Sequence, residues 1–285
     1  LRTARRRLRR GGRRLLSGLS RSHRLASPTP YVRRRRRCPV LAVAGGKGGS
    51  GKTTTTVGLA RALARRGASV VAADADWDLP NLTTAASETA GRVATSTRQT
   101  TGTRAAVDER THSPSAPAQN APSVLDVLTA GEFAPAEHPS PTILDAPDPG
   151  TDVDLTHTFE TLETLVAPSS PLLVDCPAGV SPDAAAPLRV ADGCVLVTPL
   201  RRAALYDTAK TAAFARRLDC PPVGTIVVRA DAVPDAVGSL FGCPVLGAVP
   251  SRPPTPLSTR SVQSAYDVIA RRLCAAYGGD RWRGA

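Results

Sequence analysis

Short apolar segments recur between residues 39 and 250, and each is bounded by glycine, proline, aspartate or cysteine. They are rich in valine, which is typical of strands that are buried on both faces of a sheet. The predicted strands are residues 39–45, 68–74, 142–147, 170–176, 193–199, 224–229 and 243–250.

The segments between these strands have the period of helices. In residues 53–67 the apolar side chains fall largely on one face, and the closing glycine is a stop signal. The other predicted helices are 123–131, 152–166, 181–191 (which contains Pro187), 203–218 and 258–277. Alternating strands and helices imply right-handed crossovers. We therefore predict the α/β class, with a doubly wound, mostly parallel sheet that has helices on both faces.

Two segments depart from this rhythm. Residues 84–122 are rich in threonine, serine and alanine, so burial of large apolar groups cannot offset the entropy of ordering them. We expect a flexible surface insertion there, within one domain that covers residues 38–277. Residues 278–285 form a short tail that is broken by glycine and makes a poor membrane-binding helix.

The positive charge is concentrated at the N-terminus. Residues 1–37 contain fifteen arginines and no acid, so subtracting them from the net charge of +13 leaves −2 for the remaining chain. We expect this tail to be disordered. Three interpretations stay open: a solvated arm, an arm that binds DNA or acidic lipid, and a mis-set translation start, since the chain opens with leucine and contains no methionine.

The six cysteines are scattered and form no C-x-x-C pair, which argues against a zinc site and a disulfide scaffold. We therefore expect a reduced, cytoplasmic protein, with association at the surface of a membrane or nucleoid left open. The sequence holds no apolar stretch of about eighteen residues that would span a membrane.

The candidate chemistry begins directly after the first strand. Gly46, Gly51, Lys52 and Thr53 match the pattern G-x-x-x-x-G-K-[ST] between a predicted strand and a predicted helix. Glycines let backbone N–H groups turn inward around an anion, and the start of the helix adds partial positive charge. We expect Lys52 to bridge the β- and γ-phosphates of a nucleotide and the Thr53 hydroxyl to ligate Mg²⁺. The predicted nucleotide-binding residues are Gly46, Lys47, Gly48, Gly49, Ser50, Gly51, Lys52, Thr53 and Thr54.

A second lysine in this loop is more informative. Lys47 is one of only three lysines in the chain, and an ordinary loop of this type needs no charge at its position. The stretch "KGGSGKTT" resembles the deviant Walker A signature of the MinD/ParA family. The resemblance implies a homodimer that sandwiches two nucleotides, in which Lys47 reaches the phosphates bound by the other subunit and acts as a catalytic cation beside Lys52.

Two acidic residues follow the second strand. Asp74 and Asp76 lie two positions apart in "VVAADADWDLPNL" and so point the same way from the sheet edge. The stretch is similar to a switch loop of the family, which implies that Asp76 orients the attacking water, that Asp74 is an outer partner of Mg²⁺ and that Asn81 lies near the dimer interface. The alternative is that these acids cap the next helix. We expect Trp77 to pack against the end of the sheet.

A third acidic position ends the strand "PLLVDC". Asp175 is followed by "CPAG", similar to the family's D-x-P-A-G, and a carboxylate there is suited to hold a magnesium-bound water. The resemblance makes the loop through Gly179 a second switch that responds to the γ-phosphate. We expect Cys176 to be a small buried residue.

The resemblance covers roughly residues 39–275 and has two departures. Val228 stands where the family usually has an asparagine that reads adenine, and Arg252 stands where it has an acid. Base selectivity therefore stays open.

The sequence predicts a slow, dimerising ATPase with Mg²⁺ and ATP as cofactors. It would act as a positioning, partition or regulatory switch, with its second copy and a protein at the switch loops as partners. Alternatives are a metal-cluster carrier of this fold, an amidotransferase-type synthetase and a degenerate nucleotide-binding adaptor.

Overall fold

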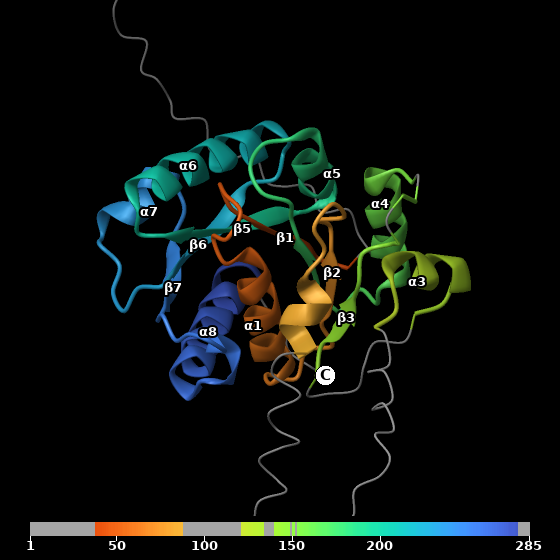
Figure 1. Ribbon diagram of the computed structural model, residues 1–285, viewed down its shortest axis with the longest axis horizontal. Coiled ribbons are helices and arrows are strands. Elements are labelled where there is room, and N and C mark those ends of the chain that lie inside the picture. Colours follow the sequence, from red (N-terminus) through yellow and green to blue (C-terminus); the bar gives the residue numbers. More distant parts are fainter. Residues whose placement is uncertain (1–37, 88–120, 134–139, 149, 152, 279–285) are drawn as a thin grey trace, which may run out of the picture. The chain divides into compact units, whose positions relative to one another are not determined.

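The computed structural model describes residues 38–87, 121–133, 140–148, 150, 151 and 153–278. Within them, seven parallel strands form one sheet in the order β3-β2-β4-β1-β5-β6-β7 (Figure 1). This confirms the predicted class, and each predicted strand overlaps an observed one. The strands are β1 (Val40–Ala44), β2 (Val71–Asp74), β3 (Thr142–Leu144), β4 (Leu172–Asp175), β5 (Gly193–Pro199), β6 (Pro222–Val228) and β7 (Val245–Val249).

Helices cover both faces of the sheet (Figure 1). One face packs against α1 (Lys52–Ala64) and α8 (Arg260–Leu273), which continues into a π-helical turn, η2 (Cys274–Gly278). The helices of the other face are α3 (Val124–Ala130), α4 (Leu155–Leu165), α5 (Pro182–Val190), α6 (Arg202–Arg217) and α7 (Ala236–Phe241).

The central strand β1 explains why the strands read as continuous apolar runs. Leu41 and Val43 belong to the cluster under α1 and α8, whereas Val40 and Ala42 belong to the cluster on the opposite face. All four are completely buried. A strand that is covered on both sides has no position left for a polar side chain.

The predicted helices are all present in the described residues. The segment around Pro187 is helical as α5, with Ser181 accepting a hydrogen bond from the Ala184 N–H as its N-cap. The proline has no backbone N–H to donate to the helix, but its side chain is buried. A short 3₁₀ turn, η1 (Pro256–Ser258), precedes α8.

Two helical segments were not predicted. Residues 82–87 are helical although the predicted insertion begins at residue 84, and α7 is a separate short helix. Both are anchored by buried apolar side chains, Leu82 in the first, and Val237 and Phe241 in the second. The rest of the predicted insertion, residues 88–120, lies outside the described residues, as do the basic tail 1–37 and residues 279–285.

The order of the strands creates a topological switch point beside the central strand β1. β1 lies between β4 and β5, so the chain leads from the centre toward both sides of the sheet. In such sheets the loops at the carboxyl ends of the strands open a crevice beside the central strand. In the part of the chain that the structure describes, no helix has the length and apolar character needed to cross a membrane.

Candidate functional site

The loop between β1 and α1 requires glycine at specific positions. Gly51, the N-cap of α1, has φ 94°, a backbone conformation that side chains disfavour. A Cβ added to Gly46 would lie 2.4 Å from the backbone carbonyl carbon of Asp207 on α6. The loop is therefore pressed against α6 and turns sharply into α1.

The turn leaves the start of α1 open to an anion. The first hydrogen bond of the helix is donated by the Thr55 N–H to the Gly51 carbonyl at 2.9 Å, so the amides before it have no acceptor inside the helix. No side chain caps the helix, and the first turn contains no acidic residue. The buried hydroxyl of Ser50 has no hydrogen-bond partner among the described residues. An orphaned donor beside free amides fits a bound phosphate.

Lys52 and Asp175 lie buried next to this loop. Lys52 is only 7% exposed, and its charge acts on Asp175, which is 1% exposed at the end of β4. The Thr56 hydroxyl donates to the Asp175 carboxylate at 3.1 Å, and Thr53 is a further hydrogen-bond partner of that carboxylate. The structure thus brings together the predicted Lys52, Thr53 and Asp175.

Burial dominates the titration of Asp175. The pKa of this carboxyl is raised from 3.8 to about 7, mainly by burial and also by the nearby charge of Asp74, while Thr53, Lys52 and Thr56 oppose the shift. The carboxyl therefore changes charge near neutrality. Oxygen donors from Thr53 and Asp175 at one point suit Mg²⁺, which keeps most of its water and takes few protein ligands.

Asp74 lies beside Asp175 in the register of β2 and β4 and organises the loop that follows it. Its carboxylate accepts the backbone N–H of Asp76 at 2.9 Å, of Asn81 at 2.9 Å and of Leu82 at 3.0 Å. The last two bonds cap the helix of residues 82–87, which is the alternative that the sequence left open. Burial raises the pKa of Asp74, and these hydrogen bonds oppose the rise.

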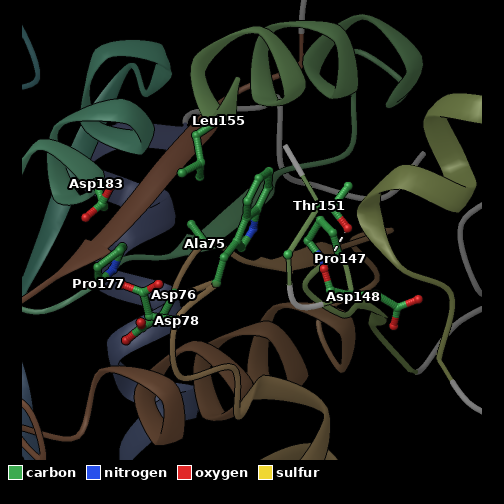
Figure 2. A pocket seen from close by; sticks show the side chains of 11 residues that line it. Ala75, Asp76, Asp78, Pro147, Asp148, Thr151, Leu155, Pro177 and Asp183 are labelled. Carbon is green, nitrogen blue, oxygen red and sulfur yellow. Dashed lines mark hydrogen bonds between the residues drawn. The ribbon is translucent and has the colours of Figure 1, made fainter. Parts of the chain in front are cut away.

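The side chain of Asp76 projects into a cavity of about 190 Å³ beside this loop. Figure 2 shows Asp76 and Asp78 near Pro177 on one side, with Asp148 and Thr151 on the other. Trp77 packs against the apolar core and donates its indole N–H to the Asp74 carbonyl at 3.1 Å, which confirms its predicted place at the sheet end. The cavity therefore lies between the two loops predicted as switches.

The second of these loops is tied directly to the glycine loop. The Gly179 N–H donates to the Gly45 carbonyl at 3.2 Å, and Gly179 itself has φ 87°. Cys176 is buried as predicted, and burial raises its thiol pKa well above the usual value. A thiol of this kind is not a nucleophile at neutral pH.

Lys47 points away from Lys52 and toward α6. Its ammonium forms an ion pair with the Asp207 carboxylate at 3.0 Å, and Lys210 approaches the other carboxylate oxygen at 3.5 Å. The Lys47 side chain is 56% exposed. The hydrogen bond from Lys47 lowers the pKa of Asp207, and Lys210 lowers it further. Sequence reasoning missed Asp207, because it lies on another element and belongs to no motif.

The two positions that depart from the family resemblance meet in a second cavity. Val228 ends β6, Arg252 follows β7, and both line a space that reaches Gly51 and Thr54 at the start of α1. Arg229 lines it too and donates to the Gly49 carbonyl at 2.7 Å. Its position at the end of the predicted strand 224–229 was the only signal in the sequence.

Comparison of the sequence with known protein families agrees with this geometry. The CobQ/CobB/MinD/ParA nucleotide binding domain family matches residues 41–252, which include the glycine loop, both acidic strand ends and the second cavity. The chain belongs to this family. The predicted resemblance to the MinD/ParA family is thereby confirmed, and residues 41–252 match the nucleotide-binding domain of that family.

Comparison with individual proteins supports this family assignment. An uncharacterized ATP-binding protein of Methanocaldococcus jannaschii is 27% identical over 255 residues, covering 83% of this chain and 88% of the relative. The septum site-determining protein MinD of Pyrococcus horikoshii, solved in complex with Mg-ADP, is 21% identical with a TM-score of 0.59, covering 82% of this chain and 94% of that one. MinD–MinC of Aquifex aeolicus gives a TM-score of 0.60 at 20% identity, over 84% of this chain and 96% of the matched chain. The MinD structures share the fold of this chain.

Proposed function

We propose that this MinD/ParA-family protein binds Mg-ATP, dimerises around it and hydrolyses it slowly as a molecular switch. The observation that carries the proposal is the separation of the two lysines of the loop. Lys52 is buried beside Asp175, whereas Lys47 is half exposed and paired with Asp207 on α6. The Methanocaldococcus relative is named as ATP-binding, and Pyrococcus MinD was solved with Mg-ADP.

Each residue of the site has one task in this proposal. The amides of the glycine loop, the Ser50 hydroxyl and Lys52 hold the phosphates. Thr53 would hold Mg²⁺ directly and Asp175 through a bound water. When bound, Mg²⁺ neutralises charge on the β- and γ-phosphates. Asp74 keeps the loop of Asp76 in place.

Asp76 would orient the water that attacks the γ-phosphate. It lines the cavity at the mouth of the site together with Pro177 of the second switch loop. Because the Gly179 amide bonds to Gly45 beside the phosphate loop, a change at the γ-phosphate would be transmitted to that switch. A partner protein that contacts the switch loops would then sense the state of the nucleotide.

Dimerisation is supported by the surface around Lys47. Large apolar side chains are exposed on the loops and the helix start that surround the site: Leu79 after β2, Val180 after β4, and Leu200 and Tyr206 at the beginning of α6. Exposed apolar side chains that share one edge of a protein are typical of an interaction surface. A second copy that covers this edge would bring its nucleotide within reach of Lys47.

The decisive experiment is ATP hydrolysis per protomer as a function of protein concentration, with Mg²⁺ present. We expect the specific rate to rise with concentration. Lys47→Ala should remove this rise and the turnover while retaining nucleotide binding, and Lys52→Ala should weaken binding itself. Arg271→Ala, on the exposed side of α8, removes a cation far from the site and serves as the control. Unchanged turnover in Lys47→Ala would refute the role of this lysine.

A further inference from the structure

The cavity beside Val228 has a composition that bears on which base the protein accepts. It measures about 160 Å³ and is lined by the ends of β6 and β7, by the segment that follows β7 and by Tyr266 of α8. Gly51 and Thr54 of the loop and of the first turn of α1 form part of its wall. Any nucleotide held at the start of α1 therefore has this cavity within reach.

The cavity is better suited to a base than the space on the other flank of the loop. That space is lined by four carboxylates, those of Asp76, Asp78, Asp148 and Asp183, and it lies at the switch loops. These carboxylates repel the negatively charged phosphates of a nucleotide. The Val228 cavity contains no acidic side chain in its lining. A bound nucleotide would therefore direct its base toward Val228.

The floor of the cavity is apolar. Val228 is 5% exposed, and its methyl carbon lies 3.5 Å from the place of a Cβ on Gly51. Tyr266 at the back is buried and uses its hydroxyl to donate to Thr55 at 3.2 Å. The floor therefore consists of the Val228 methyl groups and the Tyr266 side chain, whose hydroxyl proton is already used. An apolar floor of this kind favours the flat face of a purine without choosing between bases.

The rim supplies hydrogen-bond donors. Arg229 has φ 57°, an unusual value for arginine, and is fixed by its bond to the Gly49 carbonyl. Arg252 donates to the Ser251 carbonyl at 2.6 Å and lies 3.8 Å from Asp231. A guanidinium has five N–H donors and no acceptor, so both arginines keep donors available after these contacts. Asp231 lies outside the lining of the cavity, and no carboxylate or side-chain amide is among its lining residues.

Such a rim discriminates between purines. Guanine and hypoxanthine present two adjacent acceptors, O6 and N7, to which arginine donates in a bidentate manner, whereas adenine presents an amino donor beside N7. We propose that Arg252 reads the 6-oxo group, so that GTP and ITP bind at least as tightly as ATP. This inference rests on the proposed function, because it assumes that the phosphates occupy the glycine loop.

The test is calorimetric titration of the full chain with Mg-ATP, Mg-GTP and Mg-ITP. We expect Kd values for GTP and ITP equal to or lower than that for ATP. ITP separates the possible contacts, because it keeps O6 and N7 but lacks the amino group of guanine. Tighter binding of ATP than of both others, by about twofold or more, overturns the inference but leaves the proposed function intact. Failure of all three to bind overturns both.

Two variants test which residues set the preference between GTP, ITP and ATP. Arg252→Ala should weaken GTP and ITP about tenfold, the discrimination of one bidentate pair, and change ATP less. Equal weakening of all three would mean that Arg252 reads phosphate, and would contradict the inference. Val228→Asn adds an amide that can pair with N6 and N7 of adenine and should shift the preference toward ATP. Arg271→Ala is the control, and Arg229 is left intact because it also supports Gly49.

Discussion

At the scale of single residues, the strongest electrostatic feature is the buried carboxyl of Asp175. It lies between the cation of Lys52, which favours its charge, and the carboxylate of Asp74, which opposes it. Burial outweighs the hydrogen bonds from Thr53 and Thr56, so its pKa rises from 3.8 to about 7. The folded protein therefore holds a proton here that the unfolded chain has already released.

This carboxyl should make stability depend on pH. The stabilisation that this raised pKa provides is fully present below pH 3.8 and is lost as the pH rises through about 7. The free energy of unfolding should therefore fall between these two pH values. In EDTA without nucleotide, we expect a loss on the order of 2 to 4 kcal/mol between about pH 5 and about pH 8. Urea denaturation measures it, and Asp175→Asn should remove this component. The same slope in the variant would contradict the assignment.

Lys47 also gives a prediction at this scale. Its ammonium is held by Asp207 of the same chain, so it must leave that partner before it can reach a second subunit. Asp207→Asn should therefore lower the protein concentration at which ATP hydrolysis is half-maximal, because Lys47 is released in advance. Lys210→Ala is the matched control, since it removes the other cation on Asp207 and keeps the Lys47 pair. A higher midpoint in Asp207→Asn would show that the carboxylate assists dimerisation.

At the scale of elements, the contact between α1 and α8 positions the glycine loop. A Cβ on Gly58, in the middle of α1, would lie 2.3 Å from the Tyr266 ring of α8, which is buried and bonded to Thr55. The close approach of the two helices thus requires glycine, and the helix propensity that glycine sacrifices is offset by this packing.

Gly58→Ala should test that contact. Although alanine favours helices, overpacking against Tyr266 should reduce the free energy of unfolding by about 1 to 3 kcal/mol, as measured by urea denaturation. Gly238→Ala in α7 is the matched control, because the nearest atom to its added Cβ is the Cys243 carbonyl at 3.4 Å, an ordinary contact. That variant should be neutral or slightly stabilising. Equal effects of the two substitutions would count against the packing argument.

The elements that were predicted and those that were missed differ in how much local sequence they contain. The predicted strands and longer helices show an apolar pattern over runs of six residues (142–147) to twenty residues (258–277), which is visible without any partner. Residues 82–87 have a threonine- and alanine-rich composition and become helical where Asp74 caps Asn81 and Leu82 is buried. α7 has six residues and is fixed by Phe241. Short elements of this kind depend on contacts that periodicity does not contain.

At the scale of the whole molecule, charge is divided between the N-terminal tail and the rest. Residues 1–37 carry fifteen arginines, while the remaining chain has a net charge of −2. Any binding to DNA or acidic lipid should therefore depend on the tail rather than on the nucleotide-binding domain.

Deletion of residues 1–37 tests this division. The full chain should bind DNA without sequence preference, and its affinity should fall steeply with salt, with a slope of about 0.9 per neutralised phosphate. The truncated chain should lose this binding while its affinity for nucleotide stays the same. Fluorescence anisotropy over a salt series measures the effect. Salt-dependent DNA binding that survives the deletion would place the contact on the folded domain.

The sequence by itself determined the class of fold and the family. Apolar runs and helical periods are local properties, and Gly46, Gly51, Lys52 and Thr53 lie in one continuous segment, so their spacing alone identifies the motif. The carboxyl groups of Asp74 and Asp175 were identifiable because parallel strands end at one edge.

Only the tertiary structure decided how these groups are paired. It placed Asp207 against Lys47 and Arg229 against Gly49 across 160 and 180 residues of chain, respectively. It also raised the pKa of Asp175 by enclosing it, and assigned the oxygens of Asp74 to backbone amides. Ion pairs, burial and capping depend on distances between elements, and a linear pattern does not contain those distances.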